Sequence, residues 1–388
     1  MRDSTQIGVS LGYRGEPPYF SRERLSSWTR GLALTGVLLC FAVVAFGAYV
    51  RLTAAGLGCP DWPGCYGHLT PRVAEDSITH ATLATGPLDV EKAWREMIHR
   101  YAASTLGLVI VLILSLALLS RRWRLVDTRY AVALFAVVVF QGILGMLTVT
   151  QQLKPAFVTL HLLFGMTTLG LLWWLWLSVP RESSTPVRHP SSHPVNSTSD
   201  REKRFAYVLA LVGLFALGVQ IALGGWTSSN YAATACPDFP TCQGAWWPPM
   251  DYKNAFVLHH GLSVNYEGGI LDNAARVAIH FTHRIGAVVT TLSLVVAAVF
   301  VISRSALSGA RPYAAGVLAA LCLQLAIGIS MVVQAFPLRL ATAHTVGATL
   351  LLLATLALVR QLRATRPLFE RSHLSLGGAH GGRAFPCA

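Results

Sequence analysis

The stretch that decides the fold is residues 96–120, which read EMIHRYAASTLGLVIVLILSLALLS. After the first few residues it becomes an apolar run long enough to cross a lipid bilayer, which needs about 20 residues. Two ionisable residues, Glu96 and His99, stand near one end of this run. Side chains of this kind are expensive inside a membrane, and they mark candidate functional sites there.

Seven further apolar runs of similar length occur at residues 30–50, 130–150, 156–179, 205–226, 277–302, 312–334 and 339–359. Of the 388 residues, 53% are hydrophobic and only 13% are charged, whereas soluble domains carry about 25% charged residues. This composition excludes a disordered chain, a nucleic-acid-binding domain and an ordinary soluble enzyme. It predicts an all-α membrane protein with eight transmembrane helices.

The distribution of charge predicts the orientation of the chain. Eight spans place both termini on one side, and that side carries 21 of the 31 Lys and Arg residues but only 8 of the 18 Asp and Glu residues. The opposite side carries ten of each. The positive-inside rule therefore makes the terminal side cytoplasmic, and it explains the net charge of +13 without an anionic partner. Residues 1–28 lack a signal-peptide core, so we expect an uncleaved anchor in the bacterial plasma membrane.

An internal repeat divides the chain into two halves. Residues 59–67 read CPDWPGCYG and residues 236–244 read CPDFPTCQG. Further along each half, a His-Arg pair, a Gln and Gly pair and a Thr and His pair recur in the same order at nearly the same offset. The repeated residues are His99-Arg100 with His283-Arg284, Gln141 and Gly145 with Gln324 and Gly328, and Thr159 and His161 with Thr342 and His344.

The repeat predicts two pseudo-symmetric four-helix bundles with the same orientation in the membrane. A linker rich in Ser, Pro and charge separates them. The expected divisions are a cytoplasmic N-tail at 1–29, an N-terminal bundle at 30–179, a cytoplasmic linker at 180–204, a C-terminal bundle at 205–360 and a cytoplasmic C-tail at 361–388.

Four of the seven cysteines form two pairs in the outward loops, Cys59 with Cys65 and Cys236 with Cys242. An oxidising exterior favours disulfide bonds, so each pair is either a structural clamp or a redox-active pair. The sequence leaves both interpretations open. Cys40 and Cys322 lie within spans, where we expect them to be buried as small apolar side chains.

Four histidines lie near the outward ends of their spans: His99, His161, His283 and His344. Two imidazoles at one depth on facing helices can bind haem iron from both sides. The alternative is that the histidines form hydrogen bonds between helices. The recurrence of the histidine pair in both halves favours haem ligation instead. Each His-Arg pair adds a cation, Arg100 or Arg284, which either reaches a haem propionate or extends to the lipid headgroups.

The halves differ at one position. Glu96 precedes His99 by three residues, so both lie on one helix face, whereas His280 occupies the equivalent place in the second half. A carboxylate in an apolar pocket suits acid–base chemistry. The alternative is a glutamate that the helix dipole favours at a helix start. The asymmetry predicts chemistry in the first half and electron supply in the second, while the role of His280 stays open.

The chain resembles the haem A synthase family over roughly residues 30–360. The motifs that carry the resemblance are GAYVRLTAAGLGCPDWPGC at 47–65, EMIHR at 96–100, TLH at 159–161, CPDFPTC at 236–242, THRIGA at 282–287 and TAH at 342–344. The resemblance implies haem O as substrate at His99 and His161, with catalytic Glu96, and haem b as cofactor at His283 and His344.

The activity implied by the resemblance is oxidation of the C8 methyl of haem O to a formyl group by successive hydroxylations, which gives haem A for terminal oxidases. It further implies haem O synthase and cytochrome oxidase assembly factors as partners. The residues alone predict only a membrane protein with two bis-histidine haem sites. A quinol-linked cytochrome b and a non-enzymatic membrane haem carrier are therefore the alternatives.

Overall fold

The computed structural model of the chain describes residues 22–72, 89–120, 126–179, 197–258, 261 and 264–363. Parts of the predicted N-tail, linker and C-tail lie outside these residues. The boundaries predicted there stay predictions.

Helices make up most of the described chain, which has no β-strand beyond two isolated bridges. Eight helices of the described residues are long and apolar enough to cross a membrane, as predicted. The long helices are α1 (Arg22–Leu52), α3 (Val90–Leu119), α4 (Thr128–Thr150), α5 (Pro155–Ser178), α6 (Ser197–Ser229), α8 (Asn273–Ser303), α9 (Arg311–Val333) and α10 (Leu338–Leu362). Three short ones, η3 (Ala233–Ala235), α7 (Tyr252–Ala255) and η4 (Ser305–Ala310), lie between them.

Local sequence explains several of the helix starts. Asp89 caps α3 by accepting a hydrogen bond from the Lys92 N–H, and Asp127 caps α4 by accepting one from the Arg129 N–H. Such caps satisfy backbone donors that the first helical turn leaves free. Pro155 begins α5, where the missing N–H of proline costs nothing.

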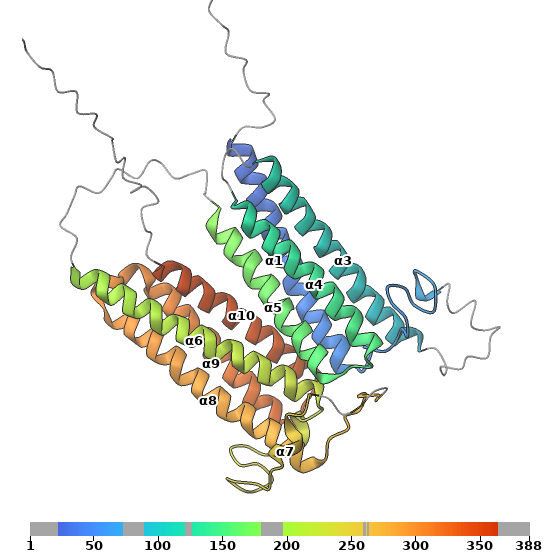
Figure 1. The fold of residues 1–388 in the computed structure, drawn as a ribbon. Helices are drawn as coiled ribbons and strands as arrows, with labels where there is room; N and C mark the ends of the chain where they lie inside the picture. The colour runs from blue at the N-terminus through green and yellow to red at the C-terminus, as the bar shows by residue number, and fades with distance from the viewer. Residues whose placement is uncertain are drawn as a thin grey trace, which may run out of the picture.

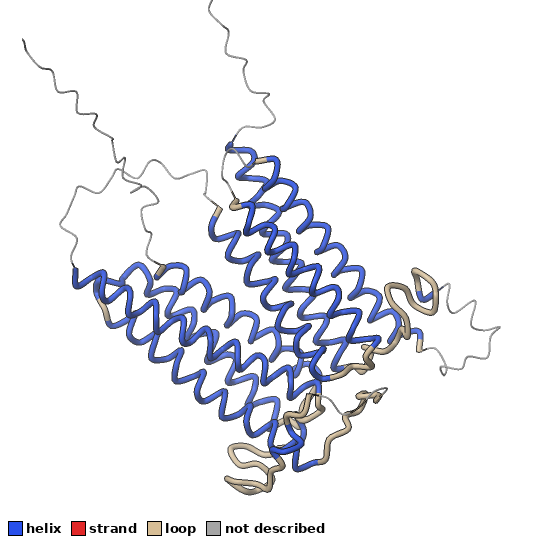
Figure 2. The backbone as a smooth tube through the Cα atoms, in the orientation of Figure 1, coloured by secondary structure: helices blue, strands red, loops and turns tan. Residues whose placement is uncertain are grey.

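The helices form two four-helix bundles, as the fold prediction stated (Figure 1). In the first, α1 packs on α3 and α5, and α4 packs on α3 and α5. In the second, α6 packs on α8 and α10, and α9 packs on α8 and α10. Helices that follow one another along the chain therefore run in opposite directions in each bundle (Figure 2). They meet where α5 packs on α6 and α10, and where α1 packs on α10.

Each bundle has its apolar core at one end. The first core includes Ile110, Ile113 and Leu169, and the second includes Leu294 and Leu358. Both lie toward the end where α1 begins and α10 finishes. The four histidines lie toward the opposite end, which we call the loop end because it carries both cysteine loops.

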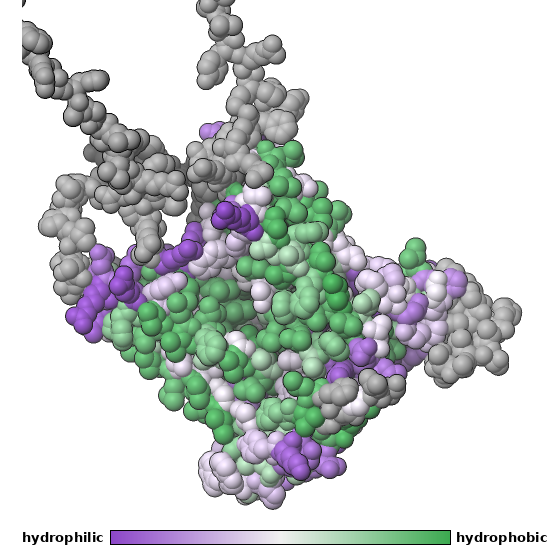
Figure 3. Space-filling model, viewed as in Figure 1, coloured by the Kyte–Doolittle hydropathy of each residue, from purple (hydrophilic) through white to green (hydrophobic). Residues whose placement is uncertain are grey.

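The surface fits a membrane environment. Apolar side chains cover the helices, and hydrophilic residues gather beyond their ends (Figure 3). Cys40 is buried as expected, but the expectation for Cys322 was wrong, because this side chain is exposed on α9. In a helix whose outer face meets lipid, a small apolar residue gains nothing by turning inward.

Candidate functional site

The four predicted histidines come from four different helices. His99 lies on α3 and His161 on α5 in the first bundle, while His283 lies on α8 and His344 on α10 in the second. All four residues are half-buried. In each bundle the two histidines lie on the diagonally opposite helices, α3 and α5 in the first and α8 and α10 in the second. The structure therefore places one predicted pair in each bundle.

A glycine on a neighbouring helix lies against each histidine ring. A β-carbon built on Gly47 of α1 would lie 2.8 Å from Cε1 of His99, and one on Gly145 of α4 would lie 3.2 Å from Cε1 of His161. In the second bundle the corresponding distances are 3.2 Å from Gly224 of α6 to His283 and 2.9 Å from Gly328 of α9 to His344. Any larger residue would displace the ring.

Glutamines accompany three of the four histidines. Nε2 of Gln141 donates to the backbone oxygen of His161 at 2.8 Å. Nε2 of Gln220 donates to the backbone oxygen of His283 at 3.0 Å and lies 3.1 Å from Nδ1 of that ring. Nε2 of Gln324 lies 3.3 Å from both ring nitrogens of His344.

The two bundles differ in how the imidazoles are satisfied. In the first bundle, Nδ1 of His99 and Nδ1 of His161 are buried and have no hydrogen-bond partner. In the second bundle, the glutamine amides reach both rings. The glutamines and glycines were missed as site residues, although the repeat of Gln141 and Gly145 was visible in the sequence.

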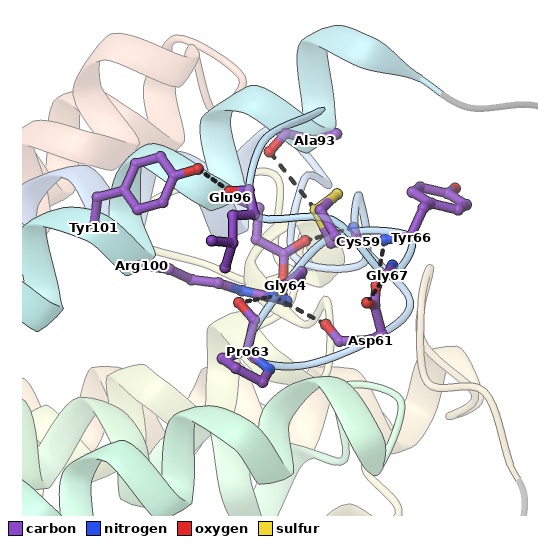
Figure 4. The surroundings of a disulfide bond; sticks show 12 residues. Cys59, Asp61, Pro63, Gly64, Tyr66, Gly67, Ala93, Glu96, Arg100 and Tyr101 are labelled. Atoms are coloured by element: carbon purple, nitrogen blue, oxygen red, sulfur yellow. Dashed lines mark hydrogen bonds and ion pairs between the residues drawn. A yellow bond between two sulfur atoms is a disulfide. The ribbon is translucent and has the colours of Figure 1, made fainter. Parts of the chain in front are cut away.

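Glu96 is buried under the first cysteine loop, with 4% of its surface exposed. Its Oε2 accepts a hydrogen bond from the Cys59 N–H at 2.9 Å, and its Oε1 accepts one from Nη2 of Arg100 at 2.5 Å (Figure 4). The carboxylate therefore joins helix α3 to the loop and to a guanidinium. His280 occupies the equivalent place in α8, also with 4% exposed, and Nε of Arg284 lies 3.3 Å from its Nε2.

Both candidate propionate-binding arginines hold the cysteine loops. Nη1 of Arg100 donates to the carbonyl oxygens of Asp61 at 2.9 Å, Pro63 at 3.2 Å and Gly64. Nη1 of Arg284 donates to the backbone carbonyl oxygen of Thr241 at 2.7 Å. Its Nη2 donates to the backbone carbonyl oxygens of Cys236 at 3.1 Å and Asp238 at 2.7 Å. Their contact with propionates stays a prediction.

Both cysteine pairs form disulfide bonds, Cys59 with Cys65 and Cys236 with Cys242. The first packs on Ala93 and Met97 of α3, and the second packs on Val277 of α8. All four cysteines are at most 1% exposed. A structural role follows from this packing, and a redox role stays a prediction.

An aspartate organises each cysteine loop. Asp61 accepts hydrogen bonds from the N–H groups of Tyr66 and Gly67. Asp238 accepts them from the Gln243 and Gly244 N–H groups and from the Thr241 hydroxyl. The Thr241 hydroxyl and these N–H groups hold the pKa of Asp238 below its usual value.

The donor set suits haem. Among the described residues no group of three or more His, Cys, Asp and Glu side chains could hold a metal ion, whereas a structural zinc site takes four ligands. Two facing imidazoles suit iron in a porphyrin plane. The glycines let the imidazole rings lie against the neighbouring helices. The buried Nδ1 atoms of His99 and His161 lack a hydrogen-bond partner, which suits a site that takes a further group.

Fold and site together define an integral membrane protein of two four-helix bundles, each with a pair of inward-facing histidines near one end. Residues 30–356 match the family of cytochrome oxidase assembly proteins called COX15-CtaA. The chain belongs to this family, which includes the haem A synthases.

Curated relatives agree with this assignment. A protein named Heme A synthase from Shewanella oneidensis is 41% identical over 331 residues, which cover 84% of this chain and 93% of the relative. Proteins of the same name from Methylobacterium radiotolerans and Paracoccus denitrificans are 27% and 28% identical. Those alignments cover 93% and 80% of this chain, and 98% and 81% of the relatives.

Proposed function

We propose that this chain is a haem A synthase, an oxidoreductase that converts the C8 methyl of haem O to a formyl group by successive hydroxylations. Family membership supports haem O as the substrate. The observation that carries the proposal is the pair of glycine-backed histidines at the loop end of each bundle. Haem O synthase and cytochrome oxidase assembly factors are the proposed partners, because they supply the substrate and use the product.

The two halves take different haems in this proposal. His99 and His161 hold the substrate, and His283 and His344 hold a resident haem b. The glutamine amides at His283 and His344 support this division, since second-shell partners fix ring orientation and strengthen ligation. Haem b, when bound, supplies one-electron transfer. The rings of the first bundle lack such partners, which suits a group that must leave as product.

Glu96 is the proposed acid–base residue. It lies one helical turn from His99 on the same face of α3, so it is on the loop side of the substrate histidine. Arg100 and the Cys59 N–H fix its two oxygens, so its position is set before substrate arrives. We assign it the role of holding or moving a proton at Oε1 or Oε2 during oxidation of the methyl group.

The proposed location is the bacterial plasma membrane, with both termini in the cytoplasm and the cysteine loops outside. The excess of basic residues near the termini supports this orientation. The two disulfides also suit an oxidising exterior.

Extraction of the pigments from purified protein tests the activity directly. Mass analysis of the porphyrins should find haem b in stoichiometric amount, with variable amounts of haem O and haem A. Two stoichiometric haem b groups together with quinol oxidation would favour the cytochrome b alternative instead. Exchange of haem without any formyl product would favour the carrier.

A Glu96→Gln variant tests the acid–base role. It preserves the shape of the side chain but removes its charge, so conversion of haem O should fall by about 100-fold or more. The haem b content should not change. Glu91→Gln is the matched control, because Glu91 lies on the same helix with its side chain 77% exposed and pairs with Arg95 rather than Arg100. Normal conversion by Glu96→Gln would remove the assigned role.

A further inference from the structure

Arg51 bridges the two bundles at the loop end. It lies in the last turn of α1, and its Nη2 donates to the carbonyl oxygens of Ser228 at 2.9 Å and Ser229 at 3.4 Å, where α6 ends. Its guanidinium carbon lies 4.2 Å from the centre of the Tyr231 ring. An arginine of the first bundle therefore contacts the end of α6 in the second bundle.

The bridge has two unused hydrogen-bond donors and no counter-charge. Nε of Arg51 and the hydroxyl of Tyr231 are both buried and without a partner. No carboxylate of the described residues forms an ion pair with Arg51. A buried cation is stabilised by an anion, and the free donors of these two contacting side chains suit an oxyanion.

The bridge lies next to the histidine pairs. Arg51 follows Gly47 by four residues, so both are on one face of α1, and Gly47 contacts the ring of His99. Across the bundle contact, Ser228 follows Gly224 by four residues, and Gly224 contacts the ring of His283. Arg51 is thus one helical turn beyond the His99 contact, on the side toward the second pair.

We propose that Arg51 and Tyr231 bind a carboxylate, namely one propionate of the haem held by His99 and His161. The inference rests on the proposed function of that histidine pair. Propionates are the charged groups of a haem. Among the described residues Arg51, unlike Arg100 and Arg284, has a buried nitrogen without a hydrogen-bond partner. A propionate in this position would complete the hydrogen bonds of both side chains and neutralise the guanidinium.

Comparison of haem O with its dimethyl ester tests the contact, because the ester has the same ring without the charges. Purified protein that carries its resident haem is titrated with each, and binding is followed by absorbance. Wild type should prefer the free acid by about tenfold, the effect of one hydrogen bond to a charged group. In Arg51→Gln this preference should fall to about twofold or less.

Arg30→Gln is the matched control. Arg30 also lies on α1, donates to the Val179 carbonyl at 3.3 Å and covers the ring of Trp176 at 4.8 Å, but it lies at the end far from the histidines. This variant should keep the wild-type preference. Tyr231→Phe removes only the hydroxyl, and it should lose part of the preference while keeping the resident haem.

Three outcomes are distinguishable. An unchanged preference in Arg51→Gln, or equal losses in Arg51→Gln and Arg30→Gln, would overturn the proposed contact. Equal binding of acid and ester by wild type would also overturn it, and would point to another oxyanion at Arg51, such as a lipid phosphate. If wild type binds neither probe although it contains haem b, the proposed function fails instead.

Discussion

At the scale of single residues, the decisive feature is the contact between each histidine and a glycine. The four glycines lie on α1, α4, α6 and α9, and each would bring a β-carbon within 3.2 Å of an imidazole carbon. Because packed interiors accept extra atoms only with strain, these positions set how far each ring stands from its neighbouring helix. Each ring is thereby held against the helix that carries its glycine.

Gly328→Ala should lower retention of haem b. The new methyl group would lie 2.9 Å from Cε1 of His344, so the ring must move, at a cost of about 1–3 kcal/mol. Gly316→Ala on the same helix is the control, since no atom lies within 4 Å of its β-carbon position. The measurement is haem b content and the temperature at which haem is released. Equal retention by both variants would refute the role of this contact.

The sequence predicted the histidines and Glu96 because they are ionisable residues in apolar runs and because they repeat. It did not identify Gln220, whose partner His283 is far along the chain and depends on which helices face each other. A signal was nevertheless present. His283 and His344 are each followed three residues later by glycine, Gly286 and Gly347, and a β-carbon at either would meet a glutamine oxygen at 2.3 Å or less.

At the scale of elements, the two cysteine loops are built alike. Each has a disulfide, an aspartate that accepts backbone N–H groups, and an isolated bridge, Cys65 with His68 or Cys242 with Ala245. Each also receives an arginine from the helix that carries a histidine. The loops are thus held to α3 and α8 by covalent, charged and apolar contacts together.

Acid should loosen the second loop. Because the folded pKa of Asp238 is lowered, its carboxylate stabilises the loop above the ordinary aspartate pKa of about 4, and this contribution is lost as the pH falls through the folded value. Asp238→Asn should lower the unfolding temperature at pH 6 and weaken its further decrease toward pH 3. Glu267→Gln, in the chain segment between this loop and α8, should follow wild type. If the unfolding temperature of Asp238→Asn depends on pH as that of wild type does, the assigned role of the Asp238 carboxylate is wrong.

At the scale of the whole molecule, the number of spans and the two-bundle fold were predictable from hydropathy and repeat alone. Helix ends were less so: α1 begins eight residues before the predicted span and α3 six residues before it. Both extensions are polar, and capping by Asp89 sets the start of α3. The pseudo-symmetry of the halves stays a prediction from the sequence repeat.

Cysteine labelling tests the proposed orientation. In a variant with Cys322→Ser and Cys387→Ser, a membrane-impermeant maleimide should label Leu258→Cys in intact cells, because this side chain lies at the loop end and is 66% exposed. Gln361→Cys, near the end of α10, should be labelled only after the membrane is opened. The reverse pattern would place the basic side outside and contradict the charge argument.

One arrangement links the loops to the centre of each bundle. Arg100 directly follows His99, and Arg284 directly follows His283. In each bundle, therefore, the arginine that donates to the cysteine loop and one candidate haem-binding histidine share one turn of helix. The hydrogen-bonded backbone of that turn links the two positions, so a shift of the backbone at the arginine also moves the histidine. A disturbance at the water-facing surface would therefore be transmitted to the imidazole as a small rotation of that turn, with no rearrangement of the apolar interior.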